Sequence, residues 1–251
     1  MKLEILERMA RDGIREMQFL LGFLKEHGLG CEKEVVEAHT WYRRSAEKGF
    51  APAAYMLFYA NSRHKNQMEA RPHTDAEDSA ALDWCRKAAR EGFAPAQLDL
   101  ASFASSPAES FQLALSAAEQ GYAHAAFYLG ALCETGYPGI EQDLQAALKW
   151  FKKASELGEE SAACAVARMY REGKGLEKDE VAAFQWYLKA FEMKSHAAAF
   201  ALGQIYATGS LGQDKDATKA DFYNTKGMEY MKRWGNSFEH PNRASETDKD
   251  S

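Results

Sequence analysis

The sequence predicts an all-α fold, an α-solenoid of about six antiparallel helix pairs preceded by an N-terminal capping helix. Three observations predict it: one segment recurs in five similar copies, a leucine or valine follows each copy at a fixed distance, and glycines end the helical patterns. Hydrophobic residues make up 46% of the chain, which is enough to form a buried core.

The recurring segment has the pattern of the second half of an amphipathic helix, here named helix B. Its copies are WYRRSAEKG at 41–49, WCRKAAREG at 84–92, LALSAAEQG at 113–121, WFKKASELG at 150–158 and WYLKAFEMK at 186–194. A weaker sixth copy begins at Tyr223. The first helix B is expected over Glu34 to Lys48, ending at Gly49. The tryptophan that opens four of the copies is expected to fill the space between neighbouring repeats.

A second recurring element, helix A, follows each helix B. Each helix A contains an apolar residue eight positions after the end of the preceding helix-B segment, at Leu21, Leu57, Leu100, Leu129, Val166 and Leu202. Glycine comes next at Gly22, Gly130 and Gly203. Because a glycine inside a helix costs about 1 kcal/mol relative to alanine, its recurrence indicates that the backbone of helix B comes close there. The first helix A is expected over Arg15 to Glu26, and a glycine-containing loop ends it.

These elements resemble the Sel1-like repeat, a relative of the tetratricopeptide repeat with longer and more variable loops. The stretches that carry the resemblance are EAHTWYRRSAEKG, YLGALCETG, ARMYREGKGLEKD and ALGQIYATG, and the likeness extends over about residues 10–230. Some copies depart from the pattern, and Lys194 replaces one terminal glycine. Phe58 replaces the glycine of the second, whose loop over 61–75 is longer, and the third has only Ser105, Ser106 and Pro107 as its turn.

The chain is expected to form one domain with a tail. Residues 1–234 are assigned to the solenoid, with a capping helix that contains Leu3, Ile5, Leu6 and Met9. Residues 235–251, which follow Trp234, are polar and lack an apolar period, so this tail is expected to be disordered.

No pattern of residues indicates catalysis. The sequence contains no HExxH, GxSxG, P-loop or complete dinucleotide-binding glycine motif, and its four cysteines have no zinc-type spacing. We therefore predict that the protein is not an enzyme and that it has no catalytic residue, cofactor or metal site.

Charge and targeting features narrow the expected partners. The net charge of -6 disfavours nucleic acid and anionic membranes as partners. The N-terminal residues do not have the pattern of a signal peptide, and no apolar run is long enough to span a membrane. We expect a cytoplasmic monomer in which Cys31, Cys85, Cys133 and Cys164 are buried thiols.

The candidate binding surface is one face of the A helices. If the recurring apolar residue is numbered 7, positions 2, 6, 9 and 13 share one side of helix A, here called the helix-A face. The predicted binding residues on this face are Leu20, Phe23, Met56, Tyr59, His124, Tyr128, Arg168, Glu172 and Gln204. The first four are apolar or aromatic, and the later ones are mostly polar. As an alternative, Leu20, Phe23 and Met56 are simply buried by the capping helix or by the long second loop.

The functional hypothesis is an adaptor or scaffold that binds a partner protein or peptide on a concave groove formed by this face. The resemblance implies a role within the range of signalling, secretion, assembly and contact between host and bacterium. Two alternatives remain. One is an immunity or inhibitor protein that clamps a specific toxin or effector enzyme, and the other is an enzyme or a regulatory subunit of an enzyme.

Overall fold

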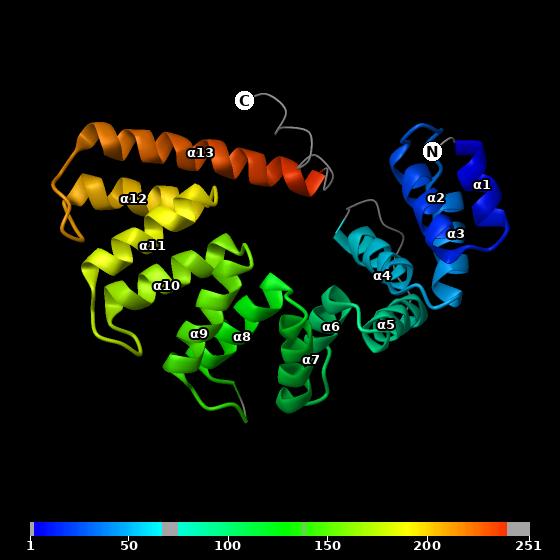
Figure 1. Ribbon diagram of the computed structural model, residues 1–251, viewed down its shortest axis with the longest axis horizontal. Coiled ribbons are helices and arrows are strands. Elements are labelled where there is room, and N and C mark those ends of the chain that lie inside the picture. The colour runs from blue at the N-terminus through cyan, green and yellow to red at the C-terminus, as the bar shows by residue number, and fades with distance from the viewer. Residues whose placement is uncertain (1–2, 67–74, 138, 240–251) are drawn as a thin grey trace. The chain divides into compact units, whose positions relative to one another are not determined.

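The computed structural model describes residues 3–66, 75–137 and 139–239. Within these ranges the chain consists of thirteen α-helices joined by loops and turns, and it contains no β-strand (Figure 1). The first helix caps the fold, and the other twelve form six successive pairs of helix A and helix B. The predicted fold class is confirmed.

Contacts between Cα atoms divide the chain into two compact units, residues 1–120 and 121–251. The first unit contains the capping helix and three pairs: α1 (Leu3–Arg11), α2 (Arg15–His27), α3 (Val35–Glu47), α4 (Ala51–Asn66), α5 (Asp75–Arg90), α6 (Ala94–Ala101) and α7 (Pro107–Glu119). The second unit contains three more: α8 (Ala123–Thr135), α9 (Leu144–Glu156), α10 (Glu160–Glu172), α11 (Glu180–Glu192), α12 (His196–Thr208) and α13 (Ala217–Glu239). The assignment of 1–234 to a single solenoid stays a prediction.

Two boundaries differ from the sequence expectation. Helix α4 continues to Asn66, into the segment expected to be the long second loop, and residues 67–74 lie outside the described part. Helix α13 continues past Trp234 to Glu239, so the helix enters the segment expected to be a tail. The remainder of that predicted tail, residues 240–251, lies outside the described residues.

The loops from helix A to helix B share their backbone geometry in several repeats. Helices α2, α10 and α12 end at Gly28, Gly173 and Gly209, each left-handed with φ between 68° and 70°. Glycine adopts this conformation without steric cost, and its amide bonds back to the last turn of the helix. At the start of the next helix, Asp143 and Asp179 accept hydrogen bonds from the backbone amides three residues on, at 2.9 and 2.8 Å.

The tryptophans of the recurring segment are less buried than core residues would be. Of these four, Trp41 is buried, and Trp84, Trp150 and Trp186 are half-buried. Trp186 nevertheless packs against core clusters that include residues of both α10 and α12, as expected of a side chain between neighbouring repeats. A lysine ammonium lies 4.4–5.2 Å from the ring centroid of each half-buried tryptophan. The residue after each tryptophan points into the pair instead, because neighbouring positions on a helix diverge by about 100°. These buried residues are Tyr42, Cys85, Phe151 and Tyr187.

The helix-A glycines make room for the buried rings. A Cβ atom added to Gly130 would lie 2.6 Å from the ring of Phe151, and one added to Gly22 would lie 2.9 Å from the ring of Tyr42. The backbone of helix B does come close at Gly22, where the added Cβ would lie 3.0 Å from the Ala38 carbonyl oxygen. At Gly130 the close neighbour is the ring of Phe151, so the expectation of a backbone approach is corrected there. The second repeat reverses the sizes: Phe58 of α4 and the small Cys85 of α5 lie in one core cluster.

The cysteines are all free thiols, but only Cys85 and Cys133 are buried. Cys31 and Cys164 are half-buried, so the expectation of four buried thiols is correct for two of them. Burial raises the pKa of Cys85 to about 12, which keeps this thiol protonated.

Candidate functional site

In the first unit, the helix-A face begins on α2. Leu20 packs against the cluster formed by α1, α2 and α3, which includes Leu6 and Trp41, so much of its side chain belongs to the core. This placement agrees with the alternative interpretation of Leu20. Phe23 is half-buried, its ring lies 4.4 Å from the ring of His27, and the Nδ1 atom of His27 lies 2.9 Å from the Phe23 carbonyl oxygen.

On α4 the same face carries one exposed aromatic ring. Tyr59 is 40% exposed and stacks on Tyr55, with ring centroids 6.3 Å apart, while Met56 is half-buried. The hydroxyl of Tyr55 donates a hydrogen bond of 2.8 Å to Asp99 on α6. Burial raises the pKa of the Asp99 carboxyl, and the bond from Tyr55 opposes that rise. Tyr59 therefore lies over a partly buried tyrosine–aspartate pair.

In the second unit, three A helices present equivalent positions to the same face. Position 6 is occupied by Tyr128 on α8, Ala165 on α10 and Ala201 on α12. Tyr128 and Ala201 are half-buried, whereas Ala165 is buried and so does not belong to the accessible surface. Gln204 and Thr208 are exposed near the C-terminal end of α12. The face thus combines half-buried apolar residues with exposed polar ones.

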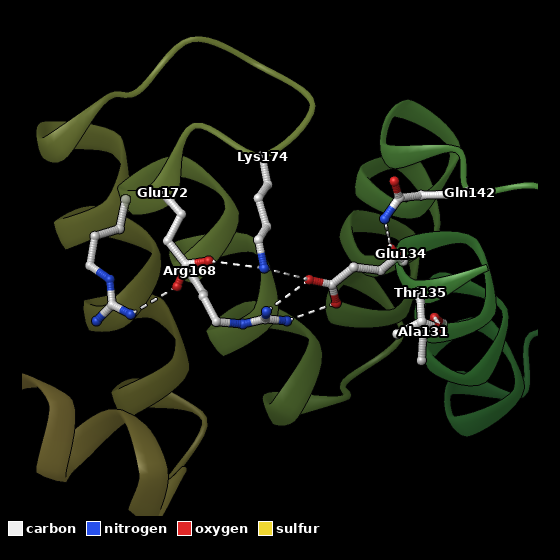
Figure 2. Close-up of polar contacts among 8 residues, drawn as sticks. Ala131, Glu134, Thr135, Gln142, Arg168, Glu172 and Lys174 are labelled. Atoms are coloured by element: carbon white, nitrogen blue, oxygen red, sulfur yellow. Dashed lines mark hydrogen bonds and ion pairs between the residues drawn. The ribbon is translucent and has the colours of Figure 1, made fainter.

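The polar residues of α10 form an ion-pair network with α8 (Figure 2). The two terminal nitrogens of Arg168 lie 2.8 Å from the two carboxylate oxygens of Glu134. Lys174 lies 3.1 Å from Glu172 and 3.8 Å from Glu134, and Arg171 pairs with Glu172 at 3.1 Å. Lys174 is the main cause of the lowered pKa of Glu172, and Glu134 raises the pKa of Arg168. Arg168 therefore joins α8 to α10 besides lying on the face.

The sequence interpretation did not include Glu134. One signal was present: Glu134 and Glu26 occupy the same position of helix A, five residues after Leu129 and Leu21. In the first repeat, the Tyr42 hydroxyl donates a hydrogen bond of 2.7 Å to Glu26. Glu26 thus accepts from helix B of its own pair, whereas Glu134 accepts from Arg168 on helix A of the next pair. The shared position indicated a carboxylate that accepts hydrogen bonds, but not which helix supplies the donor.

His124 lies at the start of α8 and is exposed. Its Nδ1 atom is 3.3 Å from a carboxylate oxygen of the buried Glu159, and its ring stacks on Tyr122 with centroids 5.6 Å apart. Of the predicted residues, His124, Tyr128, Arg168, Glu172 and Gln204 thus lie on three A helices of the second unit. The four residues of the first unit lie on α2 and α4.

Two pockets lie outside the predicted site. One, of about 420 Å³, is lined by α5, the end of α6 and α7. The other, of about 550 Å³, lies between α12 and α13. Among the residues that the structure describes, no group of three His, Cys, Asp or Glu side chains is placed to hold a metal ion. Within the same residues, no helix has the length and apolar character needed to cross a membrane.

Comparisons with solved structures find the same fold. A protective antigen of uropathogenic Escherichia coli with an SLR fold is 27% identical, with a TM-score of 0.76, over 98% of this chain and 53% of that one. The present chain therefore spans about half the length of that antigen. A Sel1 repeat protein from Oxalobacter formigenes is 27% identical, with a TM-score of 0.75, over 85% of this chain and 84% of that one.

A third structure, an immunity protein from Pseudomonas aeruginosa, shares the fold at 17% identity and a TM-score of 0.56, over 91% of this chain and 81% of that one. The Sel1 repeat family matches the chain at residues 15–50, 73–93, 95–122, 123–159, 160–195 and 196–220. These six stretches cover more than half of the sequence, in agreement with the resemblance that the sequence motifs indicated. The chain therefore belongs to the Sel1 repeat family, whose members are scaffolds for protein–protein interaction.

Proposed function

We propose that this protein is an adaptor that holds a segment of a partner protein against the helix-A face. The observation that carries the proposal is the surface of α8, α10 and α12. The half-buried residues Tyr128 and Ala201 offer apolar contact area on α8 and α12. Gln204 and Thr208 supply exposed hydrogen-bonding groups at its margin. An apolar centre with a polar rim is the usual composition of a protein interface.

The first unit contributes an anchor of its own. The ring of Tyr59 is exposed but is held in place by stacking on Tyr55, which is itself fixed by its hydrogen bond to Asp99. A rigid aromatic side chain loses little conformational entropy when a partner covers it, and such residues often dominate the energy of an interface.

The proposal includes the setting in which the adaptor works. We propose a cytoplasmic monomer, without catalytic activity, whose partner is a protein or peptide rather than nucleic acid or membrane. The net charge of -6 supports this choice because it opposes binding to phosphate-rich surfaces.

Site-specific photo-cross-linking in the native host tests which surface the partner covers. A photoreactive phenylalanine analogue replaces Gln204 or Tyr59 on the helix-A face, and exposed Val181 on α11 or Arg43 on α3 serves as the control position. We expect discrete adducts from the first two positions and none from the controls. Adducts formed only from Val181 or Arg43 would place the partner on the B helices and would refute the proposal.

The identified partner then permits a quantitative test. Tyr59→Ala and Tyr128→Ala are each expected to weaken binding at least ~10-fold, with little change in helix content or melting temperature. If the adduct contains a toxin or effector enzyme that is inhibited in a one-to-one complex, the immunity alternative replaces the adaptor. If it contains an enzyme whose activity is modulated without being blocked, the regulatory-subunit alternative replaces it.

A further inference from the structure

The pocket of the first unit lies where helix A of the third repeat is unusually short. Helix α6 has 8 residues, whereas α2, α8, α10 and α12 have 13 each. At the C-terminal end of α6, where the other A helices continue, the pocket of about 420 Å³ opens between α5 and α7. The pocket therefore coincides with the place where helix A of this repeat stops early.

The pocket has an apolar part that faces solvent. Leu100, Phe103 and Leu113 contribute to its lining. Phe103 is 57% exposed, although its ring meets the buried ring of Phe58 edge-on, with centroids 6.4 Å apart. An exposed aromatic ring that is supported from below is suited to covering an apolar side chain of a ligand.

The polar lining contains two arginines, and among the residues that the structure describes they differ in their ion pairs. Arg86 pairs with Asp83 at 2.8 Å, and it also helps to lower the pKa of Glu109. Glu109 accepts hydrogen bonds from both the amide and the hydroxyl of Ser105, at 2.9 and 2.6 Å. For Arg90 the described part of the chain shows no ion pair.

Arg90 also departs from the repeat. The seventh position of the recurring helix-B segment is glutamate in the four other copies, at Glu47, Glu119, Glu156 and Glu192. Only the copy on α5 has an arginine there, which reverses the charge. The reversed charge and the shortened helix are separate departures from the repeat, and both border the same pocket.

We propose that this pocket binds an acidic segment of a partner protein. A glutamate or aspartate carboxylate of that segment pairs with the guanidinium of Arg90, and a neighbouring apolar side chain packs on Phe103 and Leu100. The inference rests on the proposed function only in that the ligand is a protein segment. It uses none of the nine predicted residues of the helix-A face, so the two sites can be tested separately.

A blocked dipeptide probes the pocket directly. The isotope-labelled full chain is titrated with N-acetyl-Leu-Glu-amide and, as a matched neutral probe, N-acetyl-Leu-Gln-amide, while backbone amide resonances are followed by NMR. We expect saturable shifts centred on Arg90, Phe103 and Ser105, with the glutamate probe bound about 5-fold more tightly than the glutamine probe.

The variant Arg90→Glu restores the charge that the other repeats carry, so it is expected to fold normally while losing the preference for the glutamate probe. Arg43→Glu on α3 is the matched control and should leave binding unchanged. Equal affinity for the two probes, no saturable shifts, or an unaffected Arg90→Glu variant would overturn the proposal. The same shifts with inorganic phosphate alone would also overturn it, because they would indicate a general anion site.

These outcomes are independent of the cross-linking experiment. Adducts from Gln204 or Tyr59 together with no dipeptide binding would retain the adaptor and remove the acidic-segment pocket. Dipeptide binding without such adducts would retain the pocket and place the partner away from the helix-A face.

Discussion

The two units use the same repeat with different degrees of regularity. In the second unit, helices α8 to α12 all have 13 residues, whereas α4, α5 and α6 of the first unit have 16, 16 and 8. The loops differ as well. The backbone amides of Asp143, Asp179 and Asp216 bond to carbonyl oxygens of the preceding A helix at 2.9–3.0 Å, and their carboxylates cap the next helix. Among the described residues of the first unit, Glu34 makes the equivalent amide bond, without a side-chain cap.

This comparison shows that the core tolerates an exchange of volumes where the helix lengths depart from 13 residues. Helix length does not follow the aspartate cap, because α2 and α3 have 13 residues without one and α13 has 23 residues after Asp216. In the second repeat the core stays filled because large and small side chains change places between helix A and helix B. Phe58 opposite Cys85 replaces the pairing of Gly130 with Phe151. The following predictions test this distinction.

The largest effect is expected at the helix-B ring of a regular pair. Phe151 is 1% exposed and fills the space above Gly130, so Phe151→Ala should lower the free energy of unfolding by about 3–5 kcal/mol. The half-buried neighbour Trp150 should cost about 1–2 kcal/mol when replaced by alanine. Chemical denaturation of both variants measures the difference. Equal losses would mean that both rings contribute equally to the core of the pair α8–α9.

The reversed pair of the first unit should show strong coupling. Phe58→Ala leaves a cavity and Cys85→Tyr overfills the core, so each change alone should be destabilising. Together they reproduce the pairing of Ala167 with Tyr187 in the second unit. The double variant should therefore be more stable than the sum of the single effects by about 1–3 kcal/mol. A double-mutant cycle measures this coupling free energy. Simple additivity of the two effects would refute the claim that the large and small side chains of the pair compensate for each other.

A substitution of Arg168 tests whether this residue of the helix-A face also stabilises the fold. Its bidentate pair with Glu134 is largely shielded, since the Glu134 side chain is only 11% exposed. Arg168→Ala should lower the free energy of unfolding by about 1–3 kcal/mol because it leaves the Glu134 carboxylate poorly paired. Gln204→Ala, on the same face of α12, should change stability by less than about 0.5 kcal/mol. A stable Arg168→Ala variant would show that the ion pair contributes little to the second unit.

The smallest effect concerns pH and the first unit. Burial raises the pKa of Asp99 above its unfolded value, so the folded state holds this proton to a higher pH than the unfolded state does. Stability should therefore fall as pH rises from the unfolded pKa through the folded pKa, and Asp99→Asn should remove that fall. Denaturation curves from pH 4 to 7 test this, with exposed Asp221→Asn of the second unit as control. An identical pH dependence in the wild type and Asp99→Asn would contradict it.

Much of the fold could be predicted because repetition averages out local ambiguity. Six copies in register indicated the helix pairs and the approach of the helix-B backbone at Gly22, which the structure confirms, whereas at Gly130 a ring takes the place of the backbone. Periodicity could not show which of two adjacent aromatic residues, such as Trp150 and Phe151, is buried in the core. Both fit a helical pattern, and their side chains point in directions only about 100° apart around the helix axis.

The candidate site was less accessible to sequence reasoning. The face follows from helical geometry, but the neutralising partner of Arg168 comes from another helix, 34 residues away. Similarly, the packing of Leu20 against the capping helix depends on how that helix docks. The pocket beside α6 lies where the third repeat lacks residues that the other A helices have. Missing residues leave no periodic pattern in the sequence from which a pocket could be predicted.

The exchange of volumes between the two helices of a pair has a consequence for inheritance. A duplication or deletion that carried α4 without α5 would join Phe58 to a helix bearing a second large ring, or Cys85 to a glycine helix, and either product would be misfilled. A copied pair keeps its own complement of large and small side chains. Gene rearrangements that survive in such a protein should therefore have their junctions in the short turns that follow helix B, at Gly49, Gly92 or Gly158, and the pair is the unit that recombination can move.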